Sequence, residues 1–305
     1  MKRKDLILSL LVVIVWGANF TVIRLGLNGV PSMLLVAFRY ILVAFPAVFF
    51  IKKPKIEWKY ILAYGLTVGV GQFGFLFYAI EIGMPAGIAS IVSQLQAFIT
   101  PLLGAVFFKE SIKPKQIIGF VIAAIGLSVI GIASFSNGVS TIPFGALLLN
   151  LFTPIFWSIS NIVIRFASDK ATETGEKLDM LSMVVWAGLV PPLPMVGLAL
   201  LVDTPTNLIN SLMSLNSTSI FSAIYLGYAS TLFAYGVWST LLSKYPLSKV
   251  SPLSLLVPIT GLLTARIVLS ENLSIIQWMG VSIILLGLIL ANIDIKKVFN
   301  KIHSS

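Results

Sequence analysis

The feature that most constrains this chain is a series of long apolar segments separated by short polar breaks. Each segment approaches the roughly 20 residues that an α-helix needs to cross a bilayer. Since 57% of the residues are hydrophobic and only 10% are charged, a soluble globular protein is excluded. We predict an all-α membrane protein with ten transmembrane helices. The predicted spans cover approximately residues 6–27, 33–51, 60–80, 86–108, 116–133, 144–166, 181–202, 219–243, 248–269 and 276–295.

The basic residues indicate how these spans are oriented. Of 21 Lys and Arg residues, 18 fall at every second boundary between spans, and the other boundaries carry the acids Glu81, Asp203 and Glu271. Positive residues collect in cytoplasmic loops, so we expect both termini in the cytoplasm. The net charge of +10 is then a topology signal. The expected partners are the lipid bilayer and a small molecule, with no nucleic acid.

The sequence also repeats itself, in two internal matches. The first internal match pairs Trp16 with Trp157 and 22–24 with 163–165, which are both Val-Ile-Arg, so it relates the first span to the sixth. The second internal match relates the fourth and fifth spans to the ninth and tenth. Its pairs, all in one ungapped register, are Pro85 with Pro246, Ser90 with Ser251, Glu110 with Glu271, Gln116 with Gln277, Gly119 with Gly280 and Gly126 with Gly287.

This repeat predicts two five-helix halves, residues 1–140 and residues 141–305 with a short basic cytoplasmic tail. Five is an odd number, so the second half enters the membrane from the opposite side and the repeat is inverted. Inverted repeats place a substrate pathway at the repeat interface near the bilayer midplane. We therefore expect a transporter, and the alternative is a duplicated scaffold without a pathway.

Amide and aromatic side chains within the spans are the candidate substrate-binding groups. Polar groups in a bilayer are costly unless they line a cavity or find partners, and an amide offers donors and acceptors to a neutral or zwitterionic solute. The alternative for any single amide is a hydrogen bond between helices, and for any aromatic ring ordinary packing. The candidates are Asn19, Gln72, Gln94 and Asn161 as hydrogen-bonding groups and Trp16, Phe75, Tyr78 and Trp157 as cavity walls.

Three positions need separate treatment. Residues two apart on an α-helix point about 200° apart, so Gln94 and Gln96 are not expected to face one pore, and one of them is expected to pack. Arg39 lies some six residues into its span. It either binds a substrate carboxylate or pairs with backbone carbonyls and lipid phosphate as a structural anchor, and we favour the anchor.

Several function classes lack the residues that they require. The chain has no cysteine, and its one histidine is His303, so we expect no metal and no other cofactor. Every carboxylate lies near a helix end or in a loop, which leaves no proton relay in the middle of the membrane. The HExxH, GxSxG and phosphate-loop patterns are missing too, so an enzyme is not expected.

Several motifs resemble the EamA type of the drug/metabolite transporter superfamily. They are Trp-Gly-Ala-Asn-Phe at 16–20, Phe-Arg-Tyr at 38–40, Pro-Ala-Gly-Ile-Ala-Ser at 85–90, Lys-Glu at 109–110 and Ser-Glu at 270–271. The runs at 75–87 and 252–258 further resemble bacterial exporters of O-acetylserine and cysteine. The resemblance spans the whole chain and implies ten helices around a central cavity that opens to one side at a time. In the second half Asn161 comes one residue later than Asn19 does in the first.

The leading hypothesis is an inner-membrane exporter of small amino-acid metabolites that works by alternating access. Two alternatives stay open at this point, namely efflux of aromatic or drug-like solutes and a membrane receptor or scaffold that transports nothing. The sequence does not distinguish proton antiport from facilitated diffusion.

Overall fold

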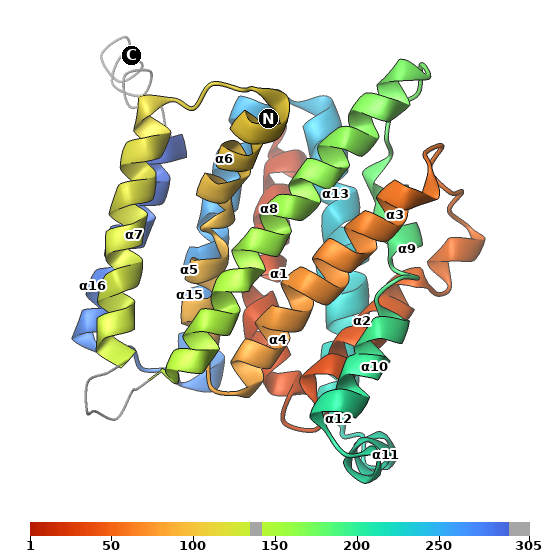
Figure 1. Ribbon diagram of the computed structural model, residues 1–305, viewed down its shortest axis with the longest axis vertical. Helices are drawn as coiled ribbons and strands as arrows, with labels where there is room; N and C mark the ends of the chain where they lie inside the picture. The colour runs from red at the N-terminus through yellow and green to blue at the C-terminus, as the bar shows by residue number, and fades with distance from the viewer. Residues whose placement is uncertain (135–141, 293–305) are drawn as a thin grey trace.

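The computed structural model describes residues 1–134 and 142–292, and these residues form helices and connecting loops without a strand (Figure 1). The tail after residue 292 and the boundary between the halves at 140/141 lie outside the described residues. The first half contains α1 (Arg3–Gly26), α2 (Ser32–Ala44), η1 (Ala47–Phe49), α3 (Trp58–Tyr64), η2 (Gly65–Phe73), α4 (Gly74–Glu81), α5 (Ala86–Ser93), α6 (Gln96–Phe108) and α7 (Pro114–Ser134). The second contains α8 (Phe144–Glu173), α9 (Met180–Ala187), α10 (Pro192–Val202), α11 (Pro205–Met213), α12 (Ser217–Ile224), η3 (Tyr225–Phe233), α13 (Ala234–Lys244), α14 (Leu247–Val250), η4 (Ser251–Leu256), α15 (Val257–Leu269) and α16 (Ile275–Asn292).

The lengths and composition of these helices fit a multi-pass membrane protein. Within the described ranges, eight helices are long and apolar enough to cross a membrane, and a ninth forms if α9 and α10, which bend by 42°, count as one span. A shorter apolar helix covers Leu253–Leu269. The segment between the seventh and eighth predicted spans contains the short helix α11. The exact number of ten spans and the orientation of the termini stay predictions.

The two halves repeat the same backbone conformation in detail. The helices α6 and α15 have the same length, and each ends at a left-handed residue, Lys109 with φ 55° and Ser270 with φ 55°. Each following loop then begins the next helix with the same contact, because the Gln116 side chain accepts a hydrogen bond from Lys113 N and the Gln277 side chain accepts one from Ser274 N, both at 2.8 Å. A two-repeat architecture accounts for this correspondence.

Glycines allow α7 and α16, the last helices of each half, to pack against each other at one edge of the molecule (Figure 1). A Cβ atom on Gly119 would lie 2.6 Å from Gly287 O, and one on Gly280 would lie 2.7 Å from Gly126 O. The second internal match pairs Gly119 with Gly280 and Gly126 with Gly287. Gly119 thus contacts Gly287, the counterpart of Gly126, and Gly280 contacts Gly126, the counterpart of Gly287. A two-fold relation between antiparallel helices produces this reciprocal pattern.

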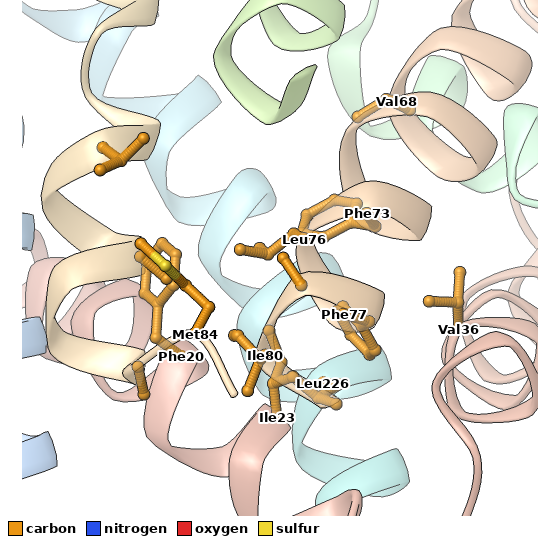
Figure 2. Close-up of a cluster of buried hydrophobic side chains, with 14 of the residues drawn as sticks. Phe20, Ile23, Val36, Val68, Phe73, Leu76, Phe77, Ile80, Met84 and Leu226 are labelled. Atoms are coloured by element: carbon orange, nitrogen blue, oxygen red, sulfur yellow. The ribbon is translucent and has the colours of Figure 1, made fainter. Parts of the chain in front are cut away.

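An apolar core surrounds the C-terminal part of α1. Figure 2 shows Phe20 and Ile23 of α1 close to Leu76 and Ile80 of α4, with Leu226 of η3 beside them. All of these side chains are at most 6% exposed. Large apolar side chains on the outer surfaces of α7, α10 and α16 are exposed instead, as lipid-facing helices require. The core thus fixes α1, α2, α4 and η3 around the middle of the molecule.

The α7–α16 contact makes a prediction for stability. Gly126→Ala should lower the free energy of unfolding by about 1–3 kcal/mol, because its Cβ would meet the backbone of α16 at Gly280 O (2.6 Å) and Ile284 N (2.9 Å). Gly197→Ala in α10 is the matched control, since its Cβ would meet nothing within 4 Å, and it should raise stability by up to about 1 kcal/mol. Denaturant unfolding of the purified protein measures both, and equal effects would contradict the packing argument.

Candidate functional site

A cavity of about 600 Å³ lies in the middle of the molecule, between the two halves. Such volumes are usual for small-molecule sites, which range over about 300–1,000 Å³. Both halves contribute tryptophan, amide and hydroxyl side chains to its wall. The lining residues are Trp16, Asn19, Phe20, Arg39, Gln72, Phe73, Leu76, Ser93, Gln94, Gln96, Thr100, Trp157, Asn161, Ser230, Tyr235, Trp238, Ser254 and Val257.

Arg39 of α2 is a fully enclosed cation in this wall, with 1% of the residue exposed. Its Nε and Nη2 donate hydrogen bonds to Thr231 Oγ1 at 3.2 and 3.0 Å, and its Nη1 donates one to Asn19 Oδ1 at 3.2 Å. The guanidinium carbon also lies 3.8 Å from the centroid of the Phe73 ring. In the described part of the chain no carboxylate forms an ion pair with it. The lipid phosphate and backbone carbonyls that we expected as partners of a structural anchor are replaced by the side chains of Thr231 and Asn19, because the guanidinium is buried away from lipid headgroups.

Asn19 connects this arginine to the second half of the chain. Its Oδ1 accepts a hydrogen bond from Ser230 Oγ at 2.7 Å in addition to the one from Arg39. One turn earlier on α1, the Trp16 indole donates to Ser230 O at 3.0 Å and packs against Tyr235 and Trp238 at centroid distances of 5.5 and 5.1 Å. Asn19 and Trp16 thus both line the cavity and hold α1 against η3 and α13.

The π-helical segments η2 and η3 supply the groups that surround Arg39. A π-turn leaves one residue more per turn than an α-helix, and such turns recur at functional sites. In η3 the Thr231 hydroxyl donates to Leu226 O at 2.8 Å, five residues back, so its oxygen can accept from the guanidinium. In η2 the wide turn presents Phe73 to the cation. Sequence reasoning missed Thr231 and Ser230, since nothing in the pattern marks a π-segment.

A second polar group lies on α6 and α8. Asn161 Nδ2 donates hydrogen bonds to Gln96 Oε1 at 3.3 Å and to Thr100 Oγ1 at 3.2 Å, and the Thr100 hydroxyl reaches Ser158 Oγ at 3.1 Å. Asn161 lines the same cavity as Asn19 despite its offset of one residue in the repeat. Trp157, one turn before Asn161, also lines the cavity. Amides at this site therefore come from both halves.

The expectation that only one of Gln94 and Gln96 reaches the cavity is wrong, because both line it. That expectation assumed a continuous α-helix, but α5 ends at Ser93 and α6 begins at Gln96. The turn between them is tightened, with Gln94 N and Leu95 N bonded to carbonyls three residues back. A turn of this type rotates each residue by more than an α-helix does, and it changes which side chains share a face.

Gln72 lies in η2 and is 4% exposed. Its Oε1 is enclosed and has no hydrogen-bond partner among the described residues. A buried amide oxygen without a donor costs free energy, so in transporters and enzymes such an atom is a candidate ligand contact.

Two of the predicted wall residues lie elsewhere. Phe75 stacks on Phe152 and Phe156 of α8 with ring centroids 4.9 and 5.5 Å apart, and Tyr78 packs against the apolar core. Neither lines the cavity. Gln72 and Phe73 at the end of η2 and Leu76 in α4 line the cavity. Phe75 instead lies on the side of α4 that faces α8. The prediction that Phe75 and Tyr78 form cavity walls is therefore wrong.

A second cavity of about 320 Å³ continues from the first, with which it shares Trp157, Asn161, Tyr235 and Trp238. It extends between α8 and α13 as far as Lys177 and Ser243, which belong to the boundaries that the lysine pattern predicts to be cytoplasmic.

The opposite end of the helices is held together by side-chain contacts. Glu271 accepts hydrogen bonds from Ala86 N at 2.7 Å and from Gly87 N at 3.0 Å, which joins the end of α15 to the start of α5. Glu81 accepts from Ser32 Oγ at 2.6 Å and joins α4 to α2. The cavity therefore extends toward one side of the molecule, and hydrogen bonds join the helix ends on the other.

Known proteins are similar to this sequence over nearly its full length. Residues 3–132 and 143–293 match the EamA-like transporter family. Proteins named probable amino-acid metabolite efflux pump, from Salmonella typhimurium (strain LT2) and Escherichia coli (strain K12), are 43% and 42% identical over 288 residues, which is 94% of this chain and 94% of each relative. A probable terminal-alkyne amino-acid exporter of Streptantibioticus cattleyicolor is 23% identical over 92% of this chain and 91% of its own.

The fold occurs among solved structures as well. One crystal structure superposes with a TM-score of 0.61 and 15% identity, covering 95% of this chain and 97% of the other. The repeat, the cavity between the halves and the match of both halves lead to the same conclusion. The chain belongs to the EamA-like transporter family.

Proposed function

We propose that the protein exports small amino-acid metabolites, such as O-acetylserine or cysteine, across the cell inner membrane by alternating access through the central cavity. The proposal includes ten spans, both termini in the cytoplasm, and two halves at residues 1–140 and 141–305. The relatives named as amino-acid metabolite efflux pumps support the class of substrate. The cavity that extends toward Lys177 supports loading from the cytoplasm.

The observation that carries the proposal is the environment of Arg39. A guanidinium has five N–H groups, and three of them donate to Thr231 and Asn19. The other two have no acceptor among the described residues, although burying an uncompensated charge is costly. A carboxylate accepts two parallel hydrogen bonds from a guanidinium edge. The α-carboxylate of an amino acid would therefore complete this site.

The groups around Arg39 fit the rest of a zwitterion. The unpartnered Oε1 of Gln72 can accept a hydrogen bond from an ammonium group, which is donor-only. Gln94, Gln96 and Asn161 remain for the polar part of the side chain, while Trp16 and Trp157 enclose its apolar part. None of the described residues that line the cavity is a carboxylate, so the positive end of the solute would be held by neutral acceptors.

Efflux of aromatic solutes remains the second candidate, because Trp16, Trp157, Tyr235 and Trp238 surround the same space. The two candidates differ in what Arg39 does. An aromatic solute without a carboxylate would leave the guanidinium unpaired, whereas an amino acid would pair with it.

Proteoliposomes test the substrate and the role of Arg39 together. The wild-type protein should move labelled O-acetylserine or cysteine, and the methyl ester of the same solute should compete at least about tenfold less well than the acid, because it cannot accept two charge-assisted bonds. Arg39→Gln should remove this preference. Arg266→Gln, an exposed arginine at the end of α15, is the control and should retain it. Equal competition by acid and ester in the wild type would contradict the proposal.

Substitutions of Gln72 and Asn19 should distinguish an effect on substrate binding from an effect on folding. Gln72→Met should leave the free energy of unfolding unchanged or higher, since the lost oxygen has no protein partner among the described residues, but it should reduce transport about tenfold. Asn19→Leu should lower the free energy of unfolding by about 1–3 kcal/mol, because Arg39 and Ser230 lose their shared acceptor. Denaturant unfolding and initial transport rates are the two measurements. A clear loss of stability in Gln72→Met would remove the argument that its oxygen awaits a ligand.

Substrate binding should be nearly independent of pH between about 5 and 8. Among the described residues, the titratable groups that line the cavity are Arg39 and Tyr235. An arginine side chain stays protonated in proteins, and a tyrosine ordinarily ionises near about pH 10, which is outside this window. A thermal-shift titration with O-acetylserine at several pH values checks this. A step or a bell-shaped profile in the window would indicate a proton-linked group that the cavity lining does not contain.

A further inference from the structure

Two glutamates occupy equivalent positions at opposite ends of the molecule. Glu110 follows α6 and Glu271 follows α15, each one residue after the left-handed residue that ends the helix. Their backbone nitrogens make the same contact, Glu110 N with Gly104 O at 3.5 Å and Glu271 N with Ala265 O at 3.3 Å. Donors and acceptors of these two contacts correspond in the register of the second internal match. The two side chains therefore start from the same backbone frame.

The two carboxylates nevertheless bind different groups. Glu271 accepts from the first two N–H groups of α5, at 2.7 and 3.0 Å, where a carboxylate also interacts favourably with the helix dipole. Glu110 instead lies 3.4 Å from Arg165 Nη1, and both of these side chains are about half exposed, at 52% and 54%. Exposed pairs of this kind contribute little stability. Glu271 joins the helices at its own end of the molecule, and the cavity extends toward the other end, where Glu110 lies.

Each group that contacts one of the two glutamates has an equivalent position in the other half of the chain. The second internal match, continued in the same register, places Ala86 and Gly87 on positions 247 and 248, which begin α14. The first internal match places Arg165 on Arg24, whose Nη1 donates to Ile80 O at a long 3.4 Å. Each glutamate thus has two potential partners, a pair of backbone N–H groups across the pathway and an arginine on the first helix of a half.

We propose that Glu271 and Glu110 exchange these partners in turn as the protein alternates between its two open states. This inference rests on the alternating access of the proposed function. In the described state Glu271 holds α5 and Glu110 pairs with Arg165. In the opposite state Glu110 leaves Arg165 and binds the backbone N–H groups at positions 247 and 248, while Glu271 releases α5 and pairs with Arg24.

The exchange explains why one end closes when the other opens. Bonds from a carboxylate to two helix N–H groups are stronger than an exposed ion pair, so each glutamate favours closure of its own end. Because the two frames are equivalent, the two preferences nearly balance. Removing one glutamate should therefore shift the population toward the state in which that end is open.

Ser93 and Ser254 provide matched reporters for this shift. They correspond in the register of the second internal match, both line the cavity, and Ser93 is only 1% exposed in the described state. The chain has no cysteine, so Ser93→Cys and Ser254→Cys each give a single thiol for a membrane-impermeant maleimide. Labelling is measured from the outside in intact cells and from the inside in inverted vesicles. Slower labelling with O-acetylserine present tests the pathway itself.

The variants should act in opposite directions. Glu271→Gln should speed labelling of Ser93→Cys from the outside by about tenfold and slow labelling of Ser254→Cys from the inside, because the closed outer end loses its charged acceptor. Glu110→Gln should do the reverse. Ala86→Pro is an independent test, since it removes one donor to Glu271 at a first helical position that accepts proline, and it should resemble Glu271→Gln. Glu173→Gln, an exposed acid paired with Lys170, is the control and should change neither rate.

The outcomes distinguish this inference from the proposed function. Thiols that the solute does not protect in the wild type would overturn the proposed pathway. Protected thiols whose labelling rates respond in the same direction to Glu271→Gln and Glu110→Gln, or respond to neither, would overturn the exchange of partners alone.

Discussion

The rest of this structure depends on the requirement that every backbone polar group within a bilayer be satisfied by the protein itself. Regular α-helices meet it on the lipid-facing surfaces of α7, α10 and α16. Further inside, the helices depart from regularity at the π-segments η2 and η3, at the 3-10 segment η4 and at the turn between α5 and α6. Each of these four segments contributes side chains to the cavity. Irregular backbone is tolerated there because neighbouring helices or the cavity supply the hydrogen-bond partners that lipid lacks.

The same requirement explains the arrangement around Arg39. A buried guanidinium would be too costly alone, and Asn19, Thr231 and the Phe73 ring offset part of that cost. They come from α1, η3 and η2, so the cation holds together elements of both halves next to the pathway. The compensation is partial, because two N–H groups and the charge itself still lack an anionic partner among the described residues. Such a site is stable enough to fold and still gains free energy when a carboxylate arrives.

The sequence predicts much of the fold and only part of the site. Apolar length and basic boundaries are enough to predict helices that cross a membrane, and the matches of Gly119 with Gly280 and of Glu110 with Glu271 are enough to predict two related halves. Trp16, Asn19, Trp157 and Asn161 reach the cavity as expected from regular helices. The expectation that only one of Gln94 and Gln96 reaches the cavity failed because it assumed α-helical periodicity, and the tightened turn between α5 and α6 changes which side chains share a face. For Phe75 and Tyr78, the sequence shows that an aromatic ring lies within a span but not which side of the helix faces the cavity. The burial of Arg39 could not be predicted from the sequence either, because it depends on the partners that η2 and η3 supply.

The two halves also differ in the residues that occupy equivalent positions at two helix crossings. At the crossing of α1 and α15, Gly17 and Gly261 allow the backbones to approach so closely that a Cβ on Gly17 would lie 2.8 Å from Gly261 N. The equivalent positions at the crossing of α8 and α6 are Ser158 and Thr100, whose hydroxyls are hydrogen bonded at 3.1 Å. At these equivalent positions, one crossing therefore has a close backbone contact, whereas the other has a hydrogen bond that borders the cavity. A duplicated scaffold with such a difference need not favour its two open states equally, even where the backbone frames of its two glutamates are equivalent.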